Sequence, residues 1–257
     1  MYLTILMLVL AATLPSSNQL LNVQPLPQSA FAYNSTAPLS IKTIAQHRSG
    51  AIVIREVSFA SDGGRRIHAE LVAPAHIGQQ HGAVLFVHWL GDPKTTNLTE
   101  FSQDALALAR QGCVLLLIDA MWSQPHWYER IRLPSTDYEK SIDQVVDLRR
   151  SIDLLEQLPG VDPRRLAFVG HDFGAMYGGV LSGVDARPRW YVLIAGNTSF
   201  SEWYLLSPKL HPPKDRAAYI AQMARLDPAL YQAESRADEF LFQFSRRDDY
   251  VPTDHAL

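Results

Sequence analysis

Apolar and polar positions along the chain predict strands and helices in alternation from about residue 50 onwards. Five short, almost continuous apolar runs have the length of strands buried on both faces. These runs cover residues 83–87, 114–118, 166–169, 191–194 and 240–244. Apolar residues at helical spacing follow the first run, and they recur from about Tyr138 to Leu158. Such alternation is typical of an α/β fold with a mainly parallel, twisted sheet and helices on both faces.

A β-hairpin is predicted ahead of this alternation. Two segments of alternating pattern, 52–59 and 67–71, flank the turn Asp62-Gly63-Gly64. Farther along, Thr136 and Glu139 have the spacing of a capping box at the start of the long helix. No internal repeat, low-complexity tract or linker follows residue 45, so we expect a single domain.

The N-terminal segment has the features of a leader. The first forty-one residues contain no charged side chain, and Leu3–Leu14 is an apolar run too short to span a bilayer. Its length suits the core of a signal peptide, and Ala30-Phe31-Ala32 offers a cleavage site. We therefore expect residues 1–32 to be a signal peptide or disordered leader and residues 33–257 to be the domain. The predicted location is secreted or periplasmic, otherwise cytoplasmic, with no stable membrane span.

Composition narrows the classes of partner. Hydrophobic residues make up 47% of the 257 residues and charged residues 19%, so burial can outweigh the entropy of ordering the chain. The net charge of −3 gives no electrostatic reason to expect nucleic acid as a partner. The single cysteine, Cys113, excludes an internal disulfide framework and a cysteine-rich zinc site. No phosphate-binding or zinc-binding motif occurs, so we predict a small-molecule substrate, no cofactor and no metal.

The pentapeptide Gly170-His171-Asp172-Phe173-Gly174 carries the candidate chemistry. It lies between the third buried strand and a helix expected to open at Ala175, and its spacing is that of a nucleophile elbow with Asp in the middle. Such a turn needs glycines where a Cβ would clash, and it lifts the middle side chain to a helix N-terminus that favours an anion. Asp172 is therefore the candidate nucleophile, because a carboxylate is ionised without help from a base. The alternative is that Asp172 only caps the helix or marks a site that has lost its activity.

The segments 161–176 and 245–252 resemble the α/β-hydrolase fold, in particular its dienelactone-hydrolase-like and acetyl-xylan-esterase-like branch. The resemblance covers roughly residues 50–257 and implies a hydrolase that acts on an ester or lactone through an elbow nucleophile. That nucleophile is usually Ser or Cys in this branch. Asp at the elbow resembles haloalkane dehalogenases and epoxide hydrolases, which attack a saturated carbon and form an ester with the enzyme. A catalytically inactive, hydrolase-fold binding protein is the third alternative.

The resemblance also implies roles for residues around the elbow. The acid of the site is Asp248, with the adjacent Asp249 as the alternative. The oxyanion hole combines the backbone N–H of Phe173 with that of Leu90, and Trp89 is the next candidate donor.

Aromatic residues and one histidine complete the set of candidates. Trp89 and Trp122, which follow the first and second buried strands, are candidates for substrate binding. Packing is an equally open explanation for the aromatic segment 121–128. His171 precedes the elbow residue and is expected to point away from the pocket, so it is not predicted to be the base.

The C-terminal end lacks the base that the resemblance implies. The family's catalytic His lies after a further strand and helix, whereas nine residues follow Asp248 and only His255 is among them. We therefore expect the last βα unit to be missing and the activity of this chain to be impaired. The segment 196–240 is also short for the helical cap of a dehalogenase, which counts against that alternative.

Overall fold

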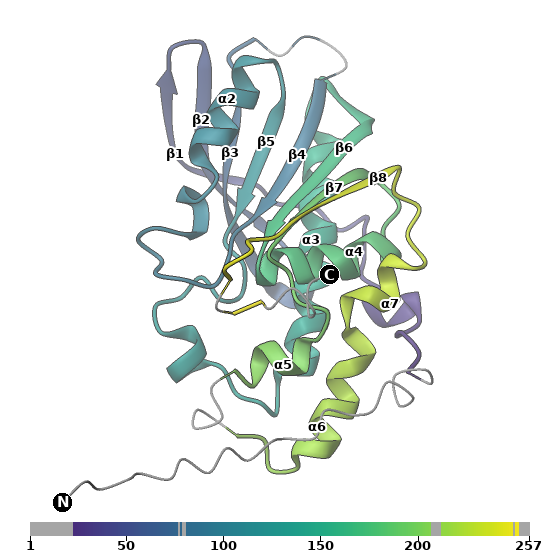
Figure 1. Cartoon of the computed structure of the whole chain (residues 1–257). Helices are drawn as coiled ribbons and strands as arrows, with labels where there is room; N and C mark the ends of the chain where they lie inside the picture. The colour runs from purple at the N-terminus through teal and green to yellow at the C-terminus, as the bar shows by residue number, and fades with distance from the viewer. Residues whose placement is uncertain (1–22, 77, 79–80, 207–211, 249, 252–257) are drawn as a thin grey trace, which may run out of the picture.

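The fold is an eight-stranded mixed sheet with helices on both faces (Figure 1). The computed structural model describes residues 23–76, 78, 81–206, 212–248 and 250–251. The sheet order is β1-β2-β3-β5-β4-β6-β7-β8. Strands β1, β2, β3 and β5 pair antiparallel in turn, and the remaining pairs are parallel. The strands are β1 (Lys42–Ser49), β2 (Ile52–Ala60), β3 (Arg66–Pro74), β4 (His81–Val87), β5 (Val114–Ile118), β6 (Val161–His171), β7 (Pro188–Ile194) and β8 (Glu239–Gln243).

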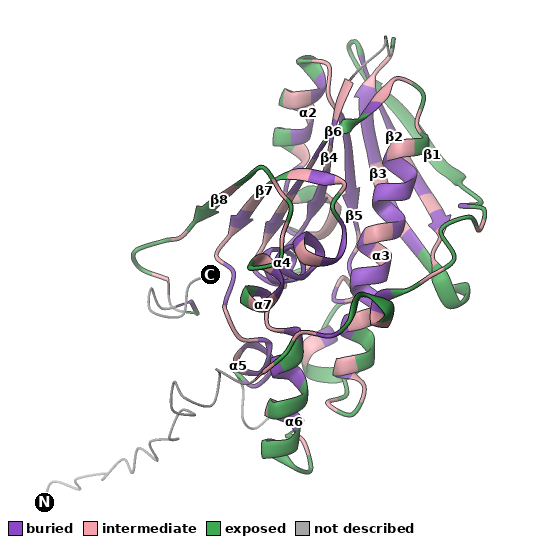
Figure 2. Ribbon diagram, turned by 90° about the vertical axis from the view of Figure 1, so that its right-hand side faces the viewer, coloured by how far each residue is buried: buried purple, intermediate pink, exposed green. Residues whose placement is uncertain are grey.

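The helices divide between the two faces of the sheet. The α-helices are α2 (Ser102–Arg110), α3 (Asp137–Gln157), α4 (Phe173–Val184), α5 (Phe200–Tyr204), α6 (Arg216–Met223) and α7 (Pro228–Gln232). Shorter or irregular turns of helix are η1 (Gln28–Phe31), η2 (Asp62–Gly64), η3 (Asn97–Thr99), η4 (Trp127–Ile131) and η5 (Ala224–Leu226). Figure 2 shows α2 and α3 on opposite sides of the central strands, and α4 as an almost wholly buried helix. In the part of the chain that is described, no helix is long and apolar enough to cross a membrane.

Neighbouring residues on the central strands point to opposite faces of the sheet and belong to two separate hydrophobic clusters. On β4, Leu85 packs in the cluster that includes α3 and α4, whereas Phe86 packs in the cluster beneath α2. Every residue of β5 is buried, because β5 lies between two strands and has a helix layer over each face. This burial explains the continuous apolar runs in the sequence.

The predicted elements are mostly present. The hairpin forms between β2 and β3, the five apolar runs are β4 to β8, and the long helix is α3. The expected burial of the fifth run on both faces is wrong, because β8 is an edge strand in which every residue but Phe240 is exposed. Strand β1 was not predicted, because all eight of its residues are exposed and they carry no apolar alternation. The capping box does not form, since the Thr136 hydroxyl donates to the carbonyl of Leu133 at 3.1 Å instead of capping α3. Helix α4 begins two residues earlier than expected, at Phe173.

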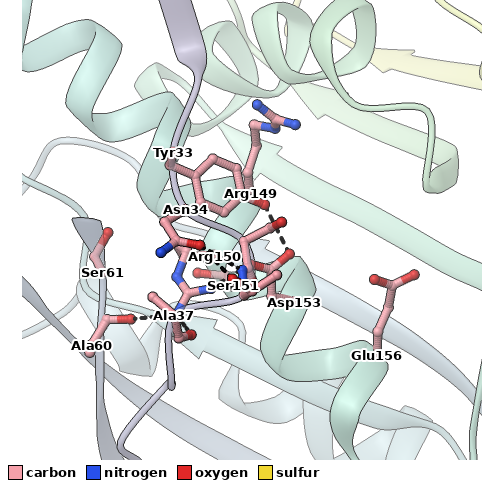
Figure 3. Close-up of polar contacts among 12 residues, drawn as sticks. Tyr33, Asn34, Ala37, Ala60, Ser61, Arg149, Arg150, Ser151, Asp153 and Glu156 are labelled. Carbon is pink, nitrogen blue, oxygen red and sulfur yellow. Dashed lines mark hydrogen bonds and ion pairs between the residues drawn. The ribbon is translucent and has the colours of Figure 1, made fainter.

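The segment 23–41 packs along the helical side of the body. Phe31 is fully buried, and its ring meets that of Tyr231 edge-on at 5.9 Å. Arg150 of α3 donates to the carbonyl of Ala37 at 3.0 Å (Figure 3). Arg149 donates to the carbonyl of Phe31 at 2.7 Å, and the Tyr33 hydroxyl donates to Asp153 at 2.9 Å. The expected boundary after residue 32 therefore falls within a packed segment, and residues 1–22 lie outside the described part. The leader remains a prediction.

Strand β8 forms one edge of the sheet. The side chains of Leu241 and Phe242 are 52% and 38% exposed there, and Phe240 stacks on Tyr191 of β7. Strand β8 therefore leaves apolar side chains on the surface at this edge of the sheet.

Candidate active site

The turn between β6 and α4 has the geometry of a nucleophile elbow. Asp172 has φ 56° and ψ −116°, a conformation that a residue with a side chain adopts only at a cost of about 1–3 kcal/mol. A Cβ on Gly174 would overlap the carbonyl oxygen of Val87, and one on Gly170 would overlap the backbone of Gly174. The two glycines thus allow α4 to start directly against β4, which holds Asp172 at the end of the sheet.

The Asp172 carboxylate is buried and only half satisfied. The side chain is 7% exposed, and its Oδ2 accepts a hydrogen bond from the backbone N–H of Leu90 at 3.0 Å. Its Oδ1 is buried, and no donor in the described part of the chain bonds to it. Burial raises the pKa of Asp172 to about 7, against the opposing effects of the Leu90 N–H, His171, the Phe173 N–H and the Trp203 indole. Burial therefore favours the protonated form of this carboxyl more than it is favoured in an exposed Asp.

A cavity of about 1010 Å³ opens beside this carboxylate. Asp172 lines it together with Leu90 and His171, and Trp203 of α5 and Tyr250 border it from the C-terminal half. The volume suits a small organic ligand.

The two expected oxyanion donors differ in what they contact. The Leu90 N–H points at the elbow, as expected, but its acceptor there is the Asp172 carboxylate itself. Trp89, the alternative donor, is turned elsewhere, because its N–H donates to Oε2 of Glu100 at 2.9 Å. The Trp89 side chain lines the cavity and packs against the His171 ring, with the ring centres 5.9 Å apart.

The expectation that His171 points away from the pocket is wrong. Its side chain is 30% exposed and lines the cavity, and its Nδ1 lies 2.6 Å from Oε1 of Glu100. Glu100 precedes α2 by two positions and was not among the predicted residues. No sequence motif links it to the elbow, since the two residues are 71 positions apart and meet only in the folded chain.

The two tryptophans proposed for substrate binding separate in the structure. Trp89 borders the cavity, whereas Trp122 is 1% exposed and is not among the residues that line it. The Trp122 ring packs against the rings of Phe173 and Tyr177, at 5.3 Å and 5.4 Å between ring centres. Of the two alternatives for Trp122, substrate binding and core packing, the structure therefore supports core packing. The same aromatic segment reaches the cavity through His126, Trp127 and Tyr128 instead.

Asp248 lies at the rim of the cavity after β8. Its Oδ1 accepts from the backbone N–H groups of Tyr250 and Val251, both at 2.9 Å, so one carboxylate oxygen shapes the turn. The alternative acid, Asp249, and the terminal His255 lie outside the described residues.

Comparisons with known proteins bear on the fold. No protein-family model matches the sequence, and a search of curated proteins finds no match. Among solved structures, an acetyl xylan esterase from Paenibacillus sp. R4 is similar with a TM-score of 0.66 and 14% identity, covering 94% of this chain and 96% of that one. An acetyl xylan esterase from Thermoanaerobacterium sp. JW/SL YS485 gives 0.65 and 14% identity, with 89% and 82% covered.

A third similar structure is a protein from Klebsiella pneumoniae assigned as a dienelactone hydrolase. Its TM-score is 0.55 at 17% identity, and the match covers 79% of this chain and 77% of that one. These similarities, the strand order and the elbow after β6 agree with one another. The chain has the α/β-hydrolase fold, and its overall structure resembles the acetyl-xylan-esterase and dienelactone-hydrolase branch.

Proposed function

We propose that this chain is a hydrolase of small esters or lactones and that Asp172 is its nucleophile. One observation carries the proposal: the carboxylate lies at the elbow beside the cavity, with Oδ2 held by the Leu90 N–H and Oδ1 without a partner. The substrate class is supported by the names of the similar structures, which are esterases and a dienelactone hydrolase. The apolar run Leu3–Leu14 supports a secreted or periplasmic location.

The burial of Oδ1 favours nucleophilic attack. A carboxylate oxygen that is exposed to water must lose its hydrogen-bonded water molecules before it attacks, and this costs free energy. A buried oxygen without hydrogen bonds does not have this cost. The atom is closed to solvent, so we expect neighbouring side chains such as the Trp203 indole, which interacts with the same carboxylate, to move when a substrate binds.

Attack on an ester restricts the leaving group. The carboxylate Oδ1 adds to the acyl carbon, the alkoxide or enolate departs, and an acyl group remains on Oδ1 as an anhydride. A carboxylate is itself a better leaving group than a simple alkoxide. We therefore expect substrates whose leaving group is an enol or a phenol, such as enol lactones and aryl esters.

A second candidate, hydrolysis of a carbon–halide or epoxide bond, is favoured by the Leu90 contact. Attack by Oδ1 on a saturated carbon creates no carbonyl oxyanion, so the hole need not be empty in the first step. When water later attacks Cγ of the resulting ester, negative charge develops on Oδ2, which already lies 3.0 Å from the Leu90 nitrogen. Against this candidate, α5 and α7 have only five residues each and α6 has eight, so the described residues form no large cap over the cavity.

Asp248 remains the proposed acid of the site. Its Oδ1 is held in the turn, which leaves Oδ2 for a cationic or hydrogen-bond donor partner at the cavity rim. Phe173 and Leu90 remain the proposed oxyanion donors. Their backbone N–H groups would stabilise the negative charge that develops on Asp172 Oδ2 when water attacks Cγ.

Turnover of three substrate classes tests the proposal. Wild type, Asp172→Asn and the matched surface variant Asp104→Asn are assayed with p-nitrophenyl acetate, an alkyl bromide and styrene oxide. We expect turnover of at least one class by wild type and Asp104→Asn, and a loss of about 1000-fold or more in Asp172→Asn. Turnover of only the bromide or the epoxide assigns the second candidate. Equal rates in wild type and Asp172→Asn, or binding without turnover in every case, overturn the proposal.

A further inference from the structure

We propose that His171, oriented by Glu100, is the base that activates water in the second half of the reaction. The inference rests on the proposed function, because it concerns hydrolysis of the covalent intermediate on Asp172. It assigns a catalytic histidine inside the described part of the chain, where the sequence predicted none.

Glu100 fixes one nitrogen of the His171 ring. Its Oε1 lies 2.6 Å from His171 Nδ1, and its Oε2 accepts from the Trp89 N–H at 2.9 Å. The Glu100 side chain is only 14% exposed, so both of its oxygens have defined partners in a nearly dry setting. A carboxylate on Nδ1 favours the tautomer that carries the proton there and leaves the lone pair on Nε2.

His171 and the reacting residue line the same cavity. His171 is the immediate neighbour of Asp172 in the sequence. The Trp89 ring, 5.9 Å away and tilted by 30°, packs against the imidazole on this side. No residue in the described part of the chain is hydrogen-bonded to His171 Nε2, and the ring is 30% exposed. In the proposed step, a water molecule that enters the cavity once the adduct has formed lies between Nε2 and the Asp172 carboxyl carbon.

The chemical step follows from these positions. Water adds to Cγ of the Asp172 ester or anhydride while His171 Nε2 takes one of its protons. The electron pair of the Cγ–Oδ2 double bond moves to Oδ2, which accepts from the Leu90 N–H. When that pair returns, the bond between Cγ and Oδ1 breaks, and the departing oxygen takes the proton from His171. Asp172 is left with one oxygen from water, and its carboxyl proton passes to solvent.

A second histidine in the same protein shows what a structural pairing looks like. His68 also contacts carboxylates, with Nδ1 2.7 Å from Asp119 and Nε2 2.8 Å from Glu56. Both of its ring nitrogens are occupied, and it does not line the active-site cavity. His171 differs in both respects, so His68→Ala is the matched control.

The test separates formation of the intermediate from its hydrolysis. Wild type, His171→Ala, Glu100→Gln and His68→Ala are mixed with the substrate that wild type turns over, and quenched samples are weighed by mass spectrometry. In His171→Ala we expect the adduct to form within a few-fold of the wild-type rate and to accumulate to about one per chain. Its hydrolysis slows by about 100-fold or more, and added imidazole restores it. Glu100→Gln slows hydrolysis without slowing formation, and His68→Ala behaves as wild type.

Each contrary result has a distinct meaning. If His171→Ala hydrolyses the adduct as fast as wild type, the assignment of the base is overturned while the proposed function stands. If His171→Ala is folded but loses adduct formation as well, His171 acts earlier in the reaction and the assignment is again overturned. If wild type neither turns over nor forms an adduct, the proposed function fails first.

Discussion

Replacing Asp172 by Asn removes a buried ionisable group and should change how stability depends on pH. In the unfolded chain this carboxyl ionises near its ordinary pKa of 3.8, whereas burial in the folded protein raises the pKa to about 7. Between these values the folded state binds more protons than the unfolded state. Stability contributed by the group is therefore complete below about pH 4 and is lost as the pH rises through about 7.

The size of the effect follows from the same two values. Each pKa unit corresponds to about 1.4 kcal/mol, so the rise from 3.8 to about 7 corresponds to about 4 kcal/mol. The asparagine side chain keeps an oxygen for the Leu90 N–H but carries no charge to bury. Relative to wild type, Asp172→Asn should gain about 4 kcal/mol in the free energy of unfolding between pH 4 and pH 8.

Urea unfolding at several pH values across this window measures the difference directly. Asp104→Asn, on the exposed face of α2, is the matched control, and its difference from wild type should stay constant with pH. If the difference between Asp172→Asn and wild type changes by less than about 1 kcal/mol across the window, Asp172 is not a desolvated carboxyl in the folded protein.

Three further predictions follow from the same structure. The kcat/KM of the wild type should rise with pH through about 7 and then level off, since Asp172 must be ionised to attack; a flat profile from pH 5 to 9 contradicts this. Phe31→Ala should lower the free energy of unfolding by about 3–5 kcal/mol in urea titrations, because the ring is fully buried, and a loss below about 1 kcal/mol places residue 31 outside the core. Gly174→Ala should destabilise by about 3 kcal/mol or prevent folding, whereas Gly82→Ala, whose Cβ would lie 3.4 Å from its nearest neighbour, should fold normally; equal stability of the two variants refutes the close packing of the elbow.

The sequence predicted strands most clearly where helices cover both faces of the strand. The runs at β4 and β5 are continuous because helices cover both faces of those strands, so composition alone indicates them. Strand β1 is an exposed edge strand, and its pairing depends on β2 rather than on its own apolar residues. Edge strands of this kind leave little periodic signal.

The elbow could be predicted locally, whereas its partners could not. Gly170 and Gly174 follow from the steric demands of a strand-to-helix turn, and the structure bears out both. The pairing of His171 with Glu100 depends on where the end of β6 meets the turn before α2, which no local pattern in the sequence records. The same limit applies to Trp122 and Trp127: both are aromatic and follow the same strand, yet only Trp127 lines the cavity.

The most direct test of Asp172 as a nucleophile is a single turnover in H₂¹⁸O with enzyme in excess over substrate. Water that attacks Cγ of the covalent intermediate leaves its oxygen on Asp172, so the peptide containing this residue should gain one ¹⁸O and the product should gain none. Oxygen-18 found only in the product, with an unlabelled Asp172 peptide and no adduct on Asp172 in quenched samples, would show that water attacks the substrate directly and would contradict the covalent route.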